Sequence, residues 1–115
     1  MMDETTQYAH KTDATELARI EQKLLQDPQN IELMDWVAFM FYSNGVRDKA
    51  LDYYLQLAAA RPRYPSYQYF LGNLHFQAGD SAAARECWAR VLSLDREGEY
   101  AAKARNKLAS LGERS

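Results

Sequence analysis

The most informative part of the chain is residues 65–94, which read PSYQYFLGNLHFQAGDSAAARECWARVLSL. Apolar side chains recur there at helical spacing, at Tyr67, Phe70, Leu71 and Leu74. This spacing is typical of an amphipathic helix. Because proline suits a first helical position, the helix is predicted to begin at Pro65, and Gly79 marks its end. A second helix is predicted over 81–94.

The same pattern occurs once more, earlier in the chain and at a constant offset. The residues that match in type at this offset are Gly45 and Gly79, Ala50 and Ala84, Tyr54 and Trp88, and Pro28 and Pro62. A small residue, a large aromatic and a proline that recur at one spacing indicate a structural repeat. Helices are therefore predicted over 31–44 and 48–60, the second capped by Asp48 and stopped by Pro62.

Half-repeats flank these two units. Residues 15–26 place apolar side chains on one helical face, at Leu17, Ile20, Leu24 and Leu25. The predicted organisation is a flexible N-terminus (1–12) and a single all-α domain (13–112) of about six antiparallel helices. The domain is divided into a half repeat (13–30), two repeats (31–64 and 65–98) and a C-terminal capping helix (99–112). About three units are the usual minimum, because one unit alone cannot bury its apolar face.

Two sets of equivalent positions in the repeats, which we call columns, have a steric interpretation. Ala50 and Ala84 are predicted at helix crossings, where a small side chain lets the axes approach to roughly 8–10 Å. Tyr54 and Trp88 follow one turn later and are predicted to fill the space where the helices splay. Gly72 lies mid-helix, where glycine costs about 1 kcal/mol relative to alanine. A close helix crossing is the natural compensation.

A helix–turn–helix unit of this length, about 34 residues, with these columns resembles the tetratricopeptide repeat (TPR). Leu71-Gly72, Gly79, Ala84 and Trp88 match the family pattern, although Met34 and Gln68 replace its tryptophan, His75 its tyrosine and Arg96 its proline. The resemblance implies a right-handed TPR-like α-α superhelix, a short α solenoid. The alternative folds are a plain antiparallel helix bundle or another helical repeat of similar length.

The resemblance also implies a protein–protein interaction module whose first helices line a concave groove. By position in the repeat, the predicted groove residues are Asp35, Phe39, Tyr42, Tyr69, Asn73, Phe76, Lys103 and Lys107. Trp36 and Phe70 fall at the edge of the groove or beneath it. An exposed aromatic patch is a common mark of a binding site. The alternative interpretation is that some of these rings are core residues packed between units.

The partner predicted for this groove is a protein, either an extended peptide or a helix, and the chain would act as an adaptor or scaffold. Chaperone-tail binding is disfavoured, because Asp35 stands where a carboxylate clamp would need a cation. One alternative is a self-assembling homo-oligomeric scaffold, since residues 1–35 carry a net charge of −5 and residues 96–115 one of +2. Another is an accessory subunit or chaperone of a bacterial envelope or secretion assembly.

Composition disfavours other classes of function. With a net charge of −2 for the 115 residues, nucleic-acid binding is not expected, and neither is membrane insertion. A lone cysteine, Cys87, and two histidines, His10 and His75, form no metal or catalytic motif, so no cofactor, metal or enzymatic activity is predicted. The expected location is the cytoplasm, or the periplasm or a membrane anchor if a signal or anchor was removed.

Overall fold

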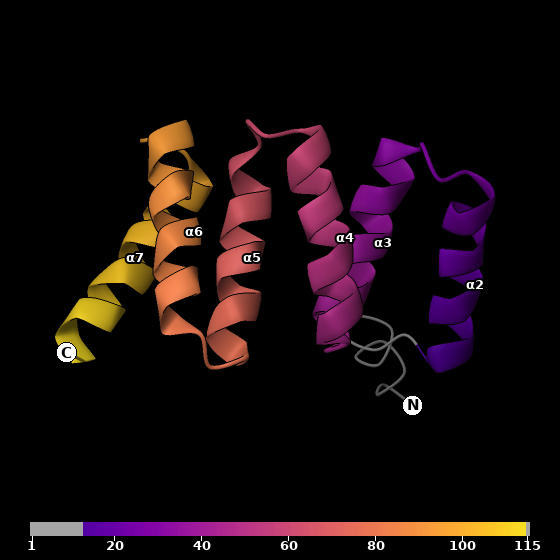
Figure 1. The fold of residues 1–115 in the computed structure, drawn as a ribbon, viewed down its shortest axis with the longest axis horizontal. Helices are drawn as coiled ribbons and strands as arrows, with labels where there is room; N and C mark the ends of the chain where they lie inside the picture. Colours follow the sequence, from indigo (N-terminus) through magenta and orange to yellow (C-terminus); the bar gives the residue numbers. More distant parts are fainter. Residues whose placement is uncertain (1–12, 115) are drawn as a thin grey trace, which may run out of the picture. The chain divides into compact units, whose positions relative to one another are not determined.

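A computed structural model describes residues 13–114, so the predicted flexible segment 1–12 lies outside the described residues. The described residues form six α-helices and no strand, which confirms the all-α prediction (Figure 1). The helices are α2 (Ala14–Gln26), α3 (Ile31–Ser43), α4 (Arg47–Ala60), α5 (Pro65–Gln77), α6 (Ser81–Leu94) and α7 (Glu99–Arg114).

The bounds of these helices repeat with the period predicted from the residue types. Helices α3, α5 and α7 begin at Ile31, Pro65 and Glu99, which are equally spaced along the chain. The same offset relates both ends of α4 to those of α6. The period seen in residue types is therefore also a period of the backbone.

The turns after α3 and α5 are built in the same way. Gly45 has a φ of +79° and Gly79 a φ of +90°, values in the left-handed region that glycine adopts without a steric penalty. The next backbone N–H donates back into the helix in both turns, from Val46 to the Phe41 carbonyl at 3.0 Å and from Asp80 to the His75 carbonyl at 2.9 Å. These bonds satisfy carbonyls that the helix end would otherwise leave unpaired.

Short polar side chains cap three of the helices. Asp13, Asn30 and Asp80 each accept a hydrogen bond from the backbone N–H three residues later, at 2.9–3.1 Å. The prediction that Asp48 caps α4 is wrong, because α4 begins at Arg47 and Asp48 lies inside its first turn. The residue equivalent to the Asp80 cap is Val46, which has no side-chain oxygen to offer.

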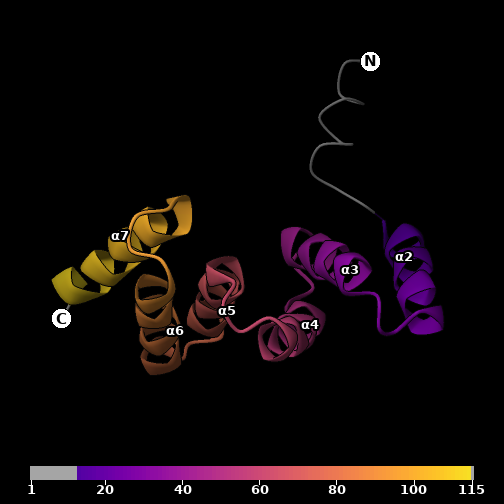
Figure 2. The same ribbon diagram turned by 90° about the horizontal axis from the view of Figure 1, so that it is seen from above.

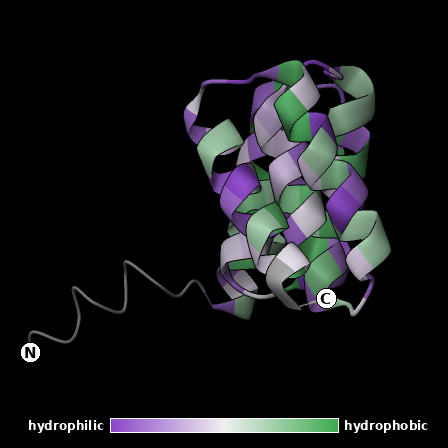
Figure 3. Cartoon of the chain, turned by 90° about the vertical axis from the view of Figure 1, so that its left-hand side faces the viewer, coloured by the Kyte–Doolittle hydropathy of each residue, from purple (hydrophilic) through white to green (hydrophobic). Residues whose placement is uncertain are grey.

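Contacts divide the described chain into two compact units, 13–53 and 54–114, with the boundary inside α4. In the first unit α2 lies beside α3, and in the second unit α5 lies beside α6 (Figure 1, Figure 2). Around the helices turned toward the viewer in Figure 3, hydrophilic and hydrophobic residues alternate.

A polar network joins α2 to α4 in the first unit. The Lys49 ammonium donates to both Glu21 carboxylate oxygens at 2.8 and 3.0 Å, and the Tyr53 hydroxyl donates to the same carboxylate at 2.6 Å. Leu17, Ile20 and Leu24 are buried on α2 as predicted, but Leu25 is 60% exposed. The prediction for Leu25 is wrong because it lies one residue, and hence about 100°, beyond Leu24 around the helix.

The second unit is packed around Trp88, which is 1% exposed. Ala84, Val91, Ala104 and Leu111 form a buried apolar cluster with it. A Cβ atom built on Gly72 would clash with the Trp88 indole nitrogen, so only glycine leaves room for the ring. The group that lies against Gly72 is thus the Trp88 indole, and the close crossing of helix axes expected there stays a prediction.

Candidate interaction surface

The predicted site residues on α3 form one stripe in the first unit. Asp35, Phe39 and Tyr42 are four and three residues apart, which places them on the same helical face. The Phe39 ring is 45% exposed and stacks on Tyr42 with centroids 6.2 Å apart. Trp36, predicted at the edge of the groove or beneath it, lies beside this stripe and is 47% exposed.

The predicted residues on α5 and α7 belong to the second unit, where three rings form a cluster. Tyr69, Phe70 and Tyr100 are half-buried, and their centroids lie 5.6–5.8 Å from one another. The contacts are tilted or edge-on, which aromatic rings favour over a face-to-face sandwich. Helix α7 thus covers part of each α5 ring and leaves the rest of each ring in solvent.

Two lysines one turn apart on α7 lie over these and neighbouring rings. The Lys103 ammonium is 5.5 Å from the Tyr100 centroid and 6.0 Å from that of Tyr69, within range of a cation–π interaction. A hydrogen bond to Glu99 raises the pKa of Lys103, and the two charged atoms are 3.3 Å apart. Both lysines are exposed, so their charge faces solvent at the edge of the rings.

The second lysine extends the same surface along α5 and α7. Lys107 lies 5.9 Å from the Trp88 ring, and the Phe76 ring, 38% exposed, lies 5.9 Å from Trp88 on the α5 side. We call the half-buried and exposed members of this set the lysine–ring surface: Tyr69, Phe70, Phe76, Tyr100, Lys103 and Lys107. All six lie in the second unit, and together they offer apolar area next to two cations.

The structure corrects the expectation that Asn73 is a surface residue. Asn73 is 7% exposed, and its Oδ1 accepts a hydrogen bond from the Trp88 indole N–H at 3.2 Å. A buried indole N–H needs such an acceptor, because an unpaired one would cost about 1–3 kcal/mol. The role of Asn73 is therefore to satisfy the core tryptophan, which its position in the repeat does not reveal.

A second aromatic feature, which the repeat pattern did not predict, lies in the loop between α4 and α5. Tyr64 is exposed and stacks on Tyr67 with centroids 5.1 Å apart and planes 13° from parallel. The Arg61 guanidinium lies 4.9 Å from the Tyr64 centroid on the same loop. The available signal in the sequence was the run Arg61-Pro62-Arg63-Tyr64, which places two arginines next to an aromatic residue.

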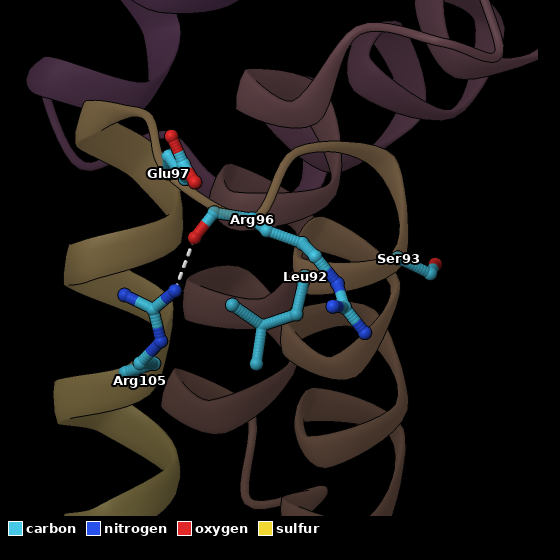
Figure 4. Close-up of a pocket in the computed structure, with 5 residues that line it drawn as sticks. All are labelled: Leu92, Ser93, Arg96, Glu97 and Arg105. Atoms are coloured by element: carbon cyan, nitrogen blue, oxygen red, sulfur yellow. Dashed lines mark hydrogen bonds between the residues drawn. The ribbon is translucent and has the colours of Figure 1, made fainter.

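None of the residues that line the pocket drawn in Figure 4 is a predicted groove residue. The pocket is lined by Leu92, Ser93, Arg96, Glu97 and Arg105, where the end of α6 meets α7. The Arg105 guanidinium donates to the Arg96 backbone carbonyl across its mouth. Another pocket is lined by Gly45–Asp48, in the turn after α3. Neither contains a nucleophile paired with a base.

Cys87, the one cysteine of the chain, is buried. Burial raises the pKa of the Cys87 thiol, which lowers its thiolate fraction at neutral pH. Within residues 13–114, no three His, Cys, Asp or Glu side chains gather closely enough to hold a metal ion. None of the helices in this part of the chain is long and apolar enough to cross a membrane.

Comparison with known proteins found no protein-family model that matches the chain and no matching curated protein.

Proposed function

We propose that this chain is a TPR-like repeat protein that serves as a non-enzymatic protein–protein interaction module. The constant period of the helix bounds and the two equivalent glycine turns support this assignment. The right-handed superhelix expected for such repeats belongs to the same proposal. In this view the molecule recognises its partner as an adaptor and performs no chemistry on it.

The observation that carries the proposal is the lysine–ring surface of the second unit. Rings already ordered by contacts with one another bury apolar area on binding at little cost in side-chain entropy. Lys103 and Lys107 at their edge favour an anionic neighbour and would repel a basic one. The partner segment that fits is therefore an acidic peptide or helix with an aromatic or aliphatic anchor.

Selection from a phage-displayed library of random peptides tests this proposal. Peptides retained by the immobilised protein are expected to combine Asp or Glu with an aromatic or aliphatic residue. The double variant Lys103→Glu with Lys107→Glu is expected to lose them, because it reverses the charge at the rings. Both side chains are exposed, so the variant is expected to keep its helical circular dichroism.

The matched control is Arg63→Glu with Arg85→Glu, which makes the same change in charge at two exposed sites of the second unit. This control is expected to retain the selected peptides. If no peptides are enriched, or if both double variants bind them equally well, the lysine–ring surface is not the binding site.

A further inference from the structure

One face of α3 has the chemistry that the lysine–ring surface requires of a partner. Glu32, Asp35, Trp36 and Phe39 follow one another at intervals of three, one and three residues, which keeps them on one side of the helix. Asp35 is half-buried, and the other three are exposed. The rings of Trp36 and Phe39 are among the most exposed large hydrophobic side chains of the described residues. This stripe is an acidic helix segment with aromatic anchors, held in shape by the rest of its unit.

The charges of the two units are of opposite sign. Residues 13–53 contain eight acidic and four basic side chains, a net charge of −4, and residues 54–114 contain six acidic and nine basic ones, a net charge of +3. Opposite net charges on two parts of one chain attract the unlike parts of two copies. The attraction also selects the pairing, since like units repel each other.

We infer that the partner of the lysine–ring surface is the α3 stripe of a second copy of this chain. The inference rests on the proposed function and names the occupant of that same surface. Glu32 and Asp35 are three residues apart, which is about 4.5 Å along the helix axis, and Lys103 and Lys107 are four apart, which is about 6 Å. These spacings are similar enough for long lysine side chains to reach both carboxylates while Trp36 and Phe39 contact the rings.

Such a contact joins two different surfaces, one from each copy. If two copies make this contact twice, once in each direction, they form a closed dimer. If each copy makes it with a different neighbour, the assembly stays open and can grow. In either arrangement the mass rises with protein concentration. Added salt weakens the association, because ions screen the charge pairs at its edge.

Sedimentation velocity across protein concentrations tests the inference on the full chain. Wild-type protein is expected to pass from 13.2 kDa to at least twice that mass as its concentration rises. The variant Glu32→Lys with Asp35→Lys and the variant Lys103→Glu with Lys107→Glu are each expected to remain monomeric. A mixture of these two variants is expected to associate, because the reversed charges are again complementary.

The variant Trp36→Ser with Phe39→Ser removes the aromatic anchors without changing the charge. It is expected to weaken self-association by about tenfold or more, as the loss of central aromatic anchors does at protein interfaces. The control Arg63→Glu with Arg85→Glu is expected to associate like the wild type. Circular dichroism on every variant separates a lost contact from a lost fold.

The outcomes distinguish this inference from the proposed function. A wild-type protein that stays monomeric at all concentrations overturns the inference, even where selected acidic peptides still bind and the proposed function stands. Association that persists in both charge-reversed variants, or a mixture of them that fails to associate, also overturns it. If neither association nor peptide binding occurs, both proposals fail.

Discussion

Helices α3 and α5 are equivalent elements of the two repeats, and their side chains at equivalent positions have different surroundings. Trp36 on α3 is 47% exposed, whereas Phe70, its counterpart on α5, is half-buried among Tyr54, Tyr69 and Tyr100. Phe39 is exposed, whereas its counterpart Asn73 is buried beneath Trp88. The backbone repeat fixes the position of a residue on its helix. The packing of the neighbouring helices determines whether the side chain is exposed to solvent.

The two tryptophans give the sharpest test of this contrast. Trp88→Ala is expected to cost about 3–5 kcal/mol in the free energy of unfolding, because it empties the centre of the second unit and leaves Asn73 without its donor. Trp36→Ala is expected to cost less than about 1 kcal/mol, since its ring is largely in solvent. Urea denaturation followed by circular dichroism measures both. Similar losses for the two variants would mean that α3 is covered to the same extent as the second-unit core.

The small residues in the middle of α3 and α5 give the next largest difference. Gly72→Ala is expected to destabilise the protein by about 1–3 kcal/mol, although alanine is the better helix former, because its Cβ would meet the Trp88 indole. The reverse change at the equivalent position, Ala38→Gly, is expected to cost about 1 kcal/mol. Thermal and urea denaturation compare the two. A Gly72→Ala protein more stable than the wild type would show that the indole has room to shift.

A third test compares Phe39 on α3 with Asn73, which occupies the equivalent position on α5. Asn73→Ala leaves the Trp88 indole N–H without its acceptor and is expected to cost about 1–3 kcal/mol. Phe39→Ala, at the equivalent position of α3, is expected to change stability by less than about 1 kcal/mol and to reduce binding of a second copy. Urea denaturation measures the stability of both variants. Equal stability of Asn73→Ala and the wild type would exclude the hydrogen bond as the reason for burying this amide.

The polar network of the first unit has apolar counterparts in the second repeat. Glu21, Lys49 and Tyr53 correspond by position to Leu55, Ala83 and Cys87. Partial burial alone would raise the pKa of Glu21, but the hydrogen bonds from Lys49 and Tyr53, together with the lysine charge, outweigh burial and lower it. The stability that this carboxylate contributes is therefore present above the usual glutamate pKa of about 4.3 and is lost as pH falls through the lower folded value.

The smallest expected effect follows from this network. Glu21→Gln is expected to remove less than about 1 kcal/mol at pH 7 and to flatten the loss of stability in acid. Burial first, and then the hydrogen bond to Glu21, raise the pKa of Tyr53, so a second loss is expected as pH rises above the usual tyrosine pKa of about 10. Urea denaturation at pH 3, 7 and 10.5 measures both changes. If Glu21→Gln loses as much stability between pH 7 and pH 3 as the wild type does, the Glu21 carboxylate is not the cause of that loss.

Much of the fold was predictable because its signals are local. A left-handed turn needs a glycine such as Gly79, a helix start favours a capping side chain such as Asp80, and Pro65 suits a first helical turn. The predicted bounds 81–94 agree with α6, and the start at Pro65 agrees with α5. The cap predicted at Asp48 failed because the helix begins one residue earlier than the acid indicates.

The candidate site was less predictable, because exposure depends on neighbours that the repeat pattern does not contain. Phe39 and Phe76 are exposed as expected of surface residues, and Lys103 and Lys107 present their charge to solvent. Whether any of these four side chains binds a partner stays a prediction. The expectation for Asn73 is wrong because the position in the repeat gives only a helix face, whereas Asn73 is buried and hydrogen-bonded to Trp88.

The period and the helices α2–α7 follow from the residue types, because each depends on the conformational needs of a few residues close along the chain. Which apolar faces are covered follows from the packing of the helices. Leu25 is left in solvent, Asn73 serves the indole of Trp88, and Tyr69, Phe70 and Tyr100 form one cluster. Burial is a property of how whole helices pack, and side chains on the same helical face have different environments when different neighbours cover them.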